Sequence, residues 1–270
     1  MNQLLLRLAA AAAFLALVPG VGPADAAGAI KLKSHKAIYD LRLGQARSGS
    51  NVADYRGRMV VEWRDTCAGY TLSQRLVSRL VDAEGGAFTS DLSVASWESH
   101  DLQQFRFTTN TQRDGEPPEL VAGRARRGAA DKPAKADFTK PESKSVEYPA
   151  DTMFPTEHSL ALIEGARAGQ PVVAATVFDG GGPDKIYRVV AFVGPRSTPR
   201  EEPPDLSGRP SWKLRLAYFP AGKDDGTPEY ELGYRMYDNG IASELVLDYG
   251  DFTVDSTLSS LELLPEPSCN

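Results

Sequence analysis

Alternation of apolar and polar residues recurs along most of the chain and predicts β-strands. In residues 35–43, Ala37, Tyr39, Leu41 and Leu43 occupy every second position. Successive side chains of a strand point to opposite faces, so this spacing gives the strand one apolar face for a core. Similar strands are predicted within residues 57–76, 77–91, 95–107, 119–126, 172–180, 185–194, 211–219, 229–249 and 251–264. About a dozen short antiparallel strands at this spacing favour a barrel, a sandwich or a curled sheet.

Two of these segments support more detailed predictions. Residues 185–194 are apolar on both faces, which favours a central strand of the sheet. Residues 229–249 read as a hairpin whose Asn239-Gly240 pair is typical of a type I′ turn. The positions predicted to face inward after that turn are Ile241, Leu245, Leu247 and Tyr249.

One segment has the spacing of an α-helix. Thr156 is the expected N-cap of a helix over residues 156–168, and Gly169 follows its last turn. The residues expected to pack against the sheet are Leu160, Ile163 and Ala166. The sequence therefore predicts a mainly β fold with one main helix.

The first residues have the pattern of a secretory signal peptide. Arg7 supplies a positive charge, and the apolar run from Leu8 to Val18 is too short to span a bilayer. Ala24-Asp25-Ala26 is typical of a cleavage site. We expect residues 1–26 to be removed on export, leaving one β domain of residues 27–270 with no transmembrane segment.

Charge argues against one class of partner and suggests another. The chain has 30 Lys and Arg against 36 Asp and Glu, a net charge of −6, which does not suggest nucleic-acid binding. Residues 127–152 are weakly periodic and predict a long excursion, with edge strands near Phe138 and Val146. A basic stretch, residues 124–135, overlaps the start of this excursion, and its basic residues could contact anionic envelope material such as lipid phosphates or could form a solvated loop. They are Arg124, Arg126, Arg127, Lys132 and Lys135.

Only two cysteines are present, Cys67 and Cys269. An exported protein reaches a compartment where disulfides persist, so we expect the two to pair. Such a bond would tie an early hairpin to the C-terminal tail. Two free, unrelated thiols are the alternative.

Catalytic and metal-binding motifs are not evident. His35, His100 and His158 do not have the spacing of metal ligands, and His158 is expected to be a surface or capping residue of the helix. Gly180-Gly181-Gly182 lacks the lysine and the following helix of a phosphate loop, so a turn is expected. Asp248, Asp251 and Asp255 could bind calcium but fit solvated strand edges better. We predict no enzyme activity, no cofactor and no metal.

Large apolar residues at inward positions are the remaining candidates for a site. They could line a cavity for an apolar ligand, or they could form a packed core. They are Tyr39, Trp63, Trp97, Phe105, Trp212, Leu216, Tyr218 and Tyr234.

A family resemblance rests on short motifs in a fixed order. The motifs are HKAIYDL (35–41), TCAGY (66–70), SWES with FRF (96–107), FPTEHSLALIEGARAG (154–169), FDG (178–180), WKLRLAYF (212–219) and GIASELVLDYGDF with the terminal cysteine (240–269). Together they resemble the EipB family of alphaproteobacterial periplasmic proteins, which is linked to cell-envelope integrity. One departure is the turn at His100-Asp101-Leu102, where an Asp-Gly turn is usual.

The resemblance implies both a fold and a function. The implied fold is a β-spiral or broken barrel of about fourteen strands with short helices and a disulfide between the two cysteines. The implied function is non-enzymatic support of envelope integrity in the periplasm. Binding to other envelope proteins is our first hypothesis for that role. The alternative is a carrier or sensor of a lipid or lipoprotein acyl chain in the concave face of the sheet.

Overall fold

A computed structural model describes residues 29–129, 131–200, 202–222 and 226–269. The expected signal peptide, residues 1–26, lies outside these ranges. The strands are β1 (His35–Ala46), β2 (Val52–Thr66), β3 (Gly69–Asp82), β4 (Ala87–Glu98), β5 (Gln104–Arg113), β6 (Glu119–Arg126), β7 (Ala134–Lys140), β8 (Lys144–Tyr148), β9 (Thr152–Met153), β10 (Val172–Phe178), β11 (Ile186–Val193), β12 (Ser211–Pro220), β13 (Tyr230–Tyr237), β14 (Ala242–Asp248) and β15 (Phe252–Leu263). The helix is α1 (Pro155–Arg167). Further short helices, which the resemblance implied, are absent from these ranges.

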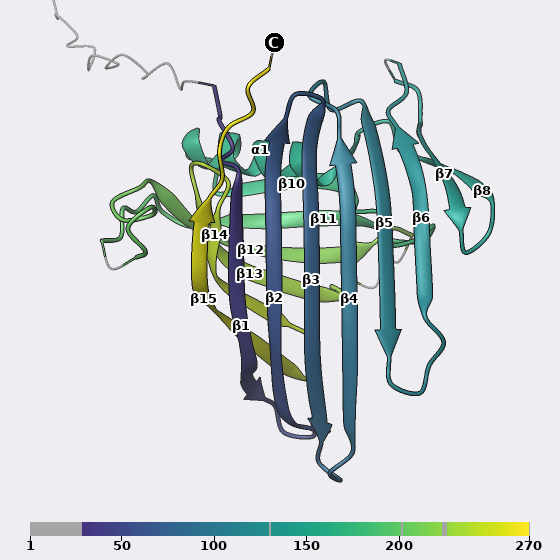
Figure 1. Ribbon diagram of the computed structural model, residues 1–270, viewed down its shortest axis with the longest axis vertical. Coiled ribbons are helices and arrows are strands. Elements are labelled where there is room, and N and C mark those ends of the chain that lie inside the picture. The colour runs from purple at the N-terminus through teal and green to yellow at the C-terminus, as the bar shows by residue number, and fades with distance from the viewer. Residues whose placement is uncertain (1–28, 130, 201, 223–225, 270) are drawn as a thin grey trace, which may run out of the picture.

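All fifteen strands belong to one sheet that curls on itself. Strands β1 to β8 are successive neighbours, β9 to β15 are successive neighbours, and β1 pairs with β15. The two edges, β8 and β9, follow each other directly in the chain. Figure 1 shows β1–β6 on one side of the molecule and β10–β13 crossing behind them. The fold is a nearly closed, barrel-like sheet, so the predicted mainly β, curled antiparallel sheet is confirmed.

The turn between β13 and β14 differs from the prediction. Gly240 has a φ of +83°, but Asn239 does not have the positive φ that a type I′ turn needs at both central residues. The Tyr237 amide instead donates to the Ile241 carbonyl at 2.9 Å across a longer turn. Beyond it, Glu244 has a φ of +53° and interrupts the pairing with β13. Leu245 and Leu247 still pack on the core as predicted, whereas Tyr249, which follows the end of β14, is 45% exposed.

The N-cap of helix α1 lies two residues earlier than predicted. Phe154 is its N-cap and makes no side-chain cap, and Thr156 lies inside the first turn. Ile163 and Ala166 are buried as expected, whereas Leu160 is only partly buried and Leu162 takes the deeper position. This face of the helix packs on buried side chains of β10–β12, including Val189, Trp212 and Leu216.

Two further contacts hold the curled sheet together. Aromatic residues of β5 and β7 pack against Phe178 at the end of β10, so side chains close the gap between the two sheet edges. Cys67, in the turn between β2 and β3, forms a disulfide with Cys269, and their Cα atoms are 5.5 Å apart. The predicted pairing is confirmed and ties an early hairpin to the segment after β15.

The strand predicted within residues 185–194 is β11. β11 lies between β10 and β12, as expected for an interior strand. Its outer face is not covered, however, and Phe192 is 56% exposed. Helix α1 covers only the inner face of β11, so the apolar residues of its other face lie outside the core.

Candidate binding pocket inside the curled sheet

The inner face of β1–β4 borders a pocket of about 230 Å³ near the start of α1. Its walls come from four parts of the chain: the segment before β1, the inner positions of β1–β4, the first turn of α1, and the region around the β13–β14 turn. The lining residues are Leu32, Lys33, His35, Tyr39, Met59, Val61, Trp63, Tyr70, Leu72, Gln74, Ser96, Glu98, Pro155, Thr156, Ser159, Asn239, Gly240, Ala242 and Leu245.

Strand register explains the apolar wall. Trp63 on β2 is directly opposite Leu72 on β3. Tyr70, two residues before Leu72, has its ring stacked on Trp63 with 5.3 Å between centroids. Tyr39 is opposite Met59, and its hydroxyl donates to the Ala242 carbonyl at 2.8 Å. Alternate residues of adjacent strands therefore form one continuous apolar surface.

One end of the pocket carries a buried carboxyl group. Glu98, the last residue of β4, is 2% exposed, and its Oε1 accepts a hydrogen bond from the Thr156 amide at 2.7 Å. This places the carboxyl at the N-terminus of α1, where unpaired amides favour an acceptor. Its Oε2 has no hydrogen-bond partner among the described residues. Burial raises the pKa of Glu98 to about 7, although the hydrogen bonds from Thr156 oppose the shift.

Other polar groups near this end are already engaged. His35 Nδ1 lies 2.7 Å from the Lys33 carbonyl, and burial lowers the pKa of His35. Arg127 forms an ion pair with Glu157 in the first turn of α1. The Arg127–Glu157 ion pair ties the first turn of the helix to the end of β6.

The predicted apolar set divides between pocket, core and outer surface. Tyr39 and Trp63 line the pocket. Trp212 and Leu216 are packed beneath α1, and Phe105 belongs to the aromatic cluster near Phe178. These three are core residues, as the alternative prediction held. Tyr218 and Tyr234 are half-buried beside the α1 core.

Trp97 is the one member of the set that faces away from the interior. Ser96 and Glu98 on either side of it line the pocket, so alternation puts Trp97 on the outer face. Its ring is covered there by the Arg106 guanidinium, 4.6 Å from the ring centroid. The inward prediction was wrong because alternation gives the inner face to Glu98, the one buried residue of β4.

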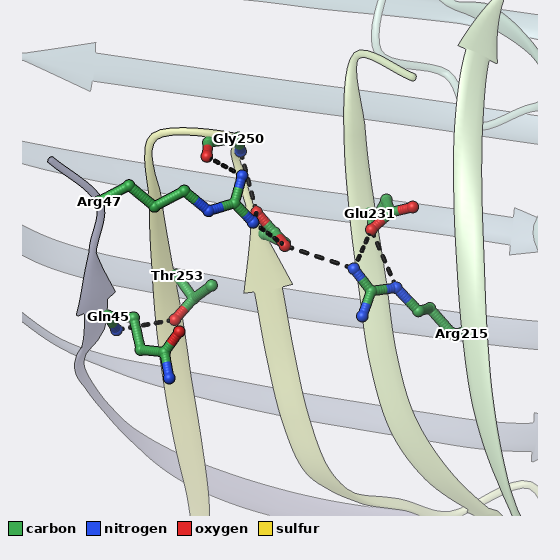
Figure 2. A network of polar contacts seen from close by, with 7 residues as sticks. Gln45, Arg47, Arg215, Glu231, Gly250 and Thr253 are labelled. Atoms are coloured by element: carbon green, nitrogen blue, oxygen red, sulfur yellow. Dashed lines mark hydrogen bonds and ion pairs between the residues drawn. The ribbon is translucent and has the colours of Figure 1, made fainter. Parts of the chain in front are cut away.

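The predictions for the other chemical groups have mixed outcomes. His158 is 6% exposed rather than at the surface, and burial lowers its pKa to about 4. Gly180 has a φ of +82° and packs on Phe107, as a turn residue. Asp248 bonds to Arg47 and Arg215 across the outer face of the sheet (Figure 2). In the parts of the chain that are described, no group of three His, Cys, Asp or Glu residues is placed to bind a metal.

Several pocket residues had no signal in the sequence. Leu32 precedes the first strand, and Asn239 and Gly240 read only as a turn. Glu98 was visible within the SWES motif, but a carboxyl on a strand suggests solvent exposure. Its role depends on α1, about 58 residues later in the chain.

None of the helices traced here is long and apolar enough to cross a membrane.

Comparison with known proteins gives consistent results. The sequence matches the EipB-like family over residues 26–265. The cell envelope integrity protein EipB of Brucella abortus (strain 2308) is 33% identical over 249 residues, which cover 90% of this chain and 88% of that protein. The fold is similar to the crystal structure of a beta-barrel-like protein of domain of unknown function DUF1849 from Brucella abortus. That match has a TM-score of 0.80 and 32% identity and covers 88% of this chain and 100% of the other.

Proposed function

Since the chain belongs to the EipB-like family, we propose that it supports cell-envelope integrity. We propose that it does so by binding an acyl chain in the pocket. Its site of action is the periplasm, which it reaches after removal of residues 1–26 as a signal peptide. Residues 27–270 then form the working β domain. The acyl chain belongs to a lipid or lipoprotein of the envelope, and the protein acts as its carrier or sensor.

The apolar pocket is the observation that carries this proposal. Interiors are normally filled to the density of organic crystals, so an open apolar space next to a packed core needs a reason. A cavity of about 150 Å³ already binds benzene, and ligand sites begin at about 300 Å³. A pocket of about 230 Å³ therefore suits part of one acyl chain. The rest of the ligand would remain outside.

We propose no catalytic step. His35 is engaged by the Lys33 carbonyl, and His100 lies 2.8 Å from Asp65 and is not part of the pocket lining. His158 is buried beside the pocket but is not part of its lining. Binding is therefore the activity that these residues support.

Binding to other envelope proteins is the second candidate, and the edge strand β8 favours it. β8 pairs with β7 on one side only, and four of its five residues are at least partly exposed. A strand of a partner could add to this edge through backbone hydrogen bonds. The two functions are compatible, because no residue of β8 lines the pocket.

Mass spectrometry of lipids that remain bound after purification from the native host tests the acyl-chain proposal. Val61→Phe would fill the pocket, whereas Val77→Phe makes the same change on the outer face of β3, where Val77 is 39% exposed. We expect wild type and Val77→Phe to retain the same lipid and Val61→Phe to lose it. Retention by all three proteins would contradict the proposal, as would a wild type that is free of lipid.

A further inference from the structure

The outer face of β5–β7 carries a group of basic residues with too few acidic partners. Inner positions on these strands hold Phe105, Phe107 and Phe138, so the residues between them face out. Those outward residues include Arg106, Arg124, Arg126 and Lys135, which we call the basic face. The protein as a whole has a net charge of −6, so this concentration of positive charge is local.

Register brings like charges directly opposite each other. Arg106 is opposite Arg124, and Arg126 is opposite Lys135. Like charges at directly opposite positions destabilise a sheet. The nearby carboxylates are Asp137, opposite Arg124, and Glu147, opposite Lys135. Four cations thus share two carboxylates.

Distances show that the basic groups keep most of their hydrogen-bond donors unused. Arg124 and Arg126 each lie 3.9 Å from Asp137, and Lys135 lies 4.0 Å from it. These are beyond hydrogen-bond distance. The Asp137 carboxylate instead accepts a hydrogen bond from the Ser145 hydroxyl at 2.5 Å. The Arg124 and Arg126 side chains are 74% and 59% exposed, so their guanidinium groups face solvent.

A second charged area of the same sheet shows what satisfied pairs look like. On the outer face of β12–β15, Arg215 donates to Glu231 at 2.9 Å, and Arg47 lies 3.1 Å from Asp248. Figure 2 shows Arg47, just after the end of β1, and Arg215, on β12, pointing toward each other. Each arginine there has a hydrogen-bonded carboxylate. The basic face lacks this arrangement, although its residues are equally long and equally close to neighbouring strands.

We propose that the basic face docks on a membrane surface that contains anionic phospholipid head groups. Phosphate oxygens would take the unused guanidinium donors and separate the like charges. The four cations lie on three neighbouring strands about 4.8 Å apart, so the face spans more than a single phosphate group. Trp97, under Arg106 at the margin, is a residue type that favours the membrane interface.

The position of the basic face fits such docking. Trp97 is at its margin, and the next residue, Glu98, lines the pocket on the opposite side of the sheet. Contact with a bilayer would therefore bring the α1 end of the pocket near lipid. Charges farther away than about 8 Å are screened at physiological salt, so the acidic remainder of the protein does not cancel the local attraction. The inference does not depend on what the pocket binds.

Co-sedimentation with lipid vesicles tests the proposal. The full mature protein is mixed with vesicles of phosphatidylcholine alone or of phosphatidylcholine with phosphatidylglycerol. We expect binding only to the second, decreasing as salt is added. Arg124→Gln/Arg126→Gln should weaken it about 25-fold, since each basic residue near such a surface contributes about fivefold. The matched control, Arg58→Gln/Arg75→Gln, removes two outer-face arginines that have their own partners, Asp40 and Asp91, and should bind as wild type does.

Three results would overturn the proposal. The first is absence of binding to the anionic vesicles at low salt. The second is equal weakening in both double variants, which would reveal an effect of total charge alone. The third is stronger binding to polyglutamate than to vesicles, which would identify an acidic polypeptide as the partner. Val61→Phe separates this inference from the acyl-chain proposal, because a blocked pocket should leave vesicle binding intact. Loss of vesicle binding in that variant would mean that the pocket, and not the basic face, binds the vesicles.

Discussion

Two parts of the same inner face are built differently. Near the free edges, Phe105, Phe107, Phe138 and Phe178 lie within ring distances of 5.3 to 6.2 Å and are at most 3% exposed. On β2 and β3, Trp63 and its neighbours are only half-buried and border the pocket. One region is filled, and the other is open.

What lies opposite each region explains the difference. The phenylalanine cluster joins β5 and β7 to the end of β10, so large side chains approach from both sides. The pocket wall instead faces the first turn of α1 and the β13–β14 turn, which present Pro155, Ser159, Gly240 and Ala242. These residues are too short to fill the space. A continuous apolar strand face therefore becomes a packed core or an open site according to the size of the residues that lie opposite it.

The largest expected effect is in the filled region. Phe178→Ala removes a ring that contacts Phe105, Phe107, Phe138 and Tyr148 and should lower the free energy of unfolding by about 3–5 kcal/mol. Leu72→Ala in the pocket wall should cost about 1 kcal/mol, because that side chain already borders open space. Urea unfolding of both variants compares the two regions. Equal costs would mean that the pocket is as tightly packed as the cluster.

Removal of the disulfide should have the next largest effect. The bond closes a loop with a sequence separation of 202 residues, for which chain entropy predicts about 5 kcal/mol and measured losses are typically about 2–5 kcal/mol. Cys67→Ser and Cys269→Ser should each destabilise the protein to that extent, and the double variant should match either single variant. Thiol labelling of the denatured, unreduced protein provides a direct check. Two reactive thiols per chain would show that the bond does not form.

A smaller, pH-dependent effect should come from the carboxyl group at the pocket end. Glu98 has its pKa raised from 4.5 to about 7, so the folded protein keeps this proton at pH values where the unfolded chain has lost it. Its contribution to stability should therefore fall as pH rises from about 4.5 to about 7 and then stay constant, a loss of roughly 3 kcal/mol. His158, with its pKa lowered to about 4, acts in the opposite direction below pH 6.5.

The contribution of Glu98 is isolated by subtracting the stability of Glu98→Gln from that of wild type at each pH. Urea unfolding across this range should give a difference that declines toward pH 7. A difference that increases with pH would mean that the hydrogen bonds from Thr156 outweigh burial. A flat difference would mean that the two effects balance.

Local patterns predicted most of the fold because strands and the helix depend on periodicity. Alternation located the strands, and Cys67 and Cys269 were the only possible pair. The failures occurred where tertiary contacts override local preference. Trp97 was assigned inward as an aromatic residue, yet Glu98 is the one buried residue of its strand. The amide of Thr156, far along the chain, donates a hydrogen bond to Oε1 of this buried carboxyl group.

The candidate site was less predictable than the fold. Tyr39 and Trp63 were named from their positions, but Trp212 and Leu216 share the same pattern and belong to the core. Alternation identifies the inner face and cannot reveal what lies opposite it. The open space depends on the placement of α1 and of Gly240, which no local pattern encodes.

Quenching of tryptophan fluorescence by an acyl chain brominated near its end tests whether the pocket holds an acyl chain. Trp97→Phe/Trp212→Phe retains only Trp63 in the pocket wall, and Trp63→Phe/Trp97→Phe retains only the core residue Trp212. We predict saturable quenching of Trp63 and no quenching of Trp212, because bromine quenches on close contact. Equal quenching of the two residues, or none of Trp63, would contradict the claim that the open part of the inner face is an acyl-chain site.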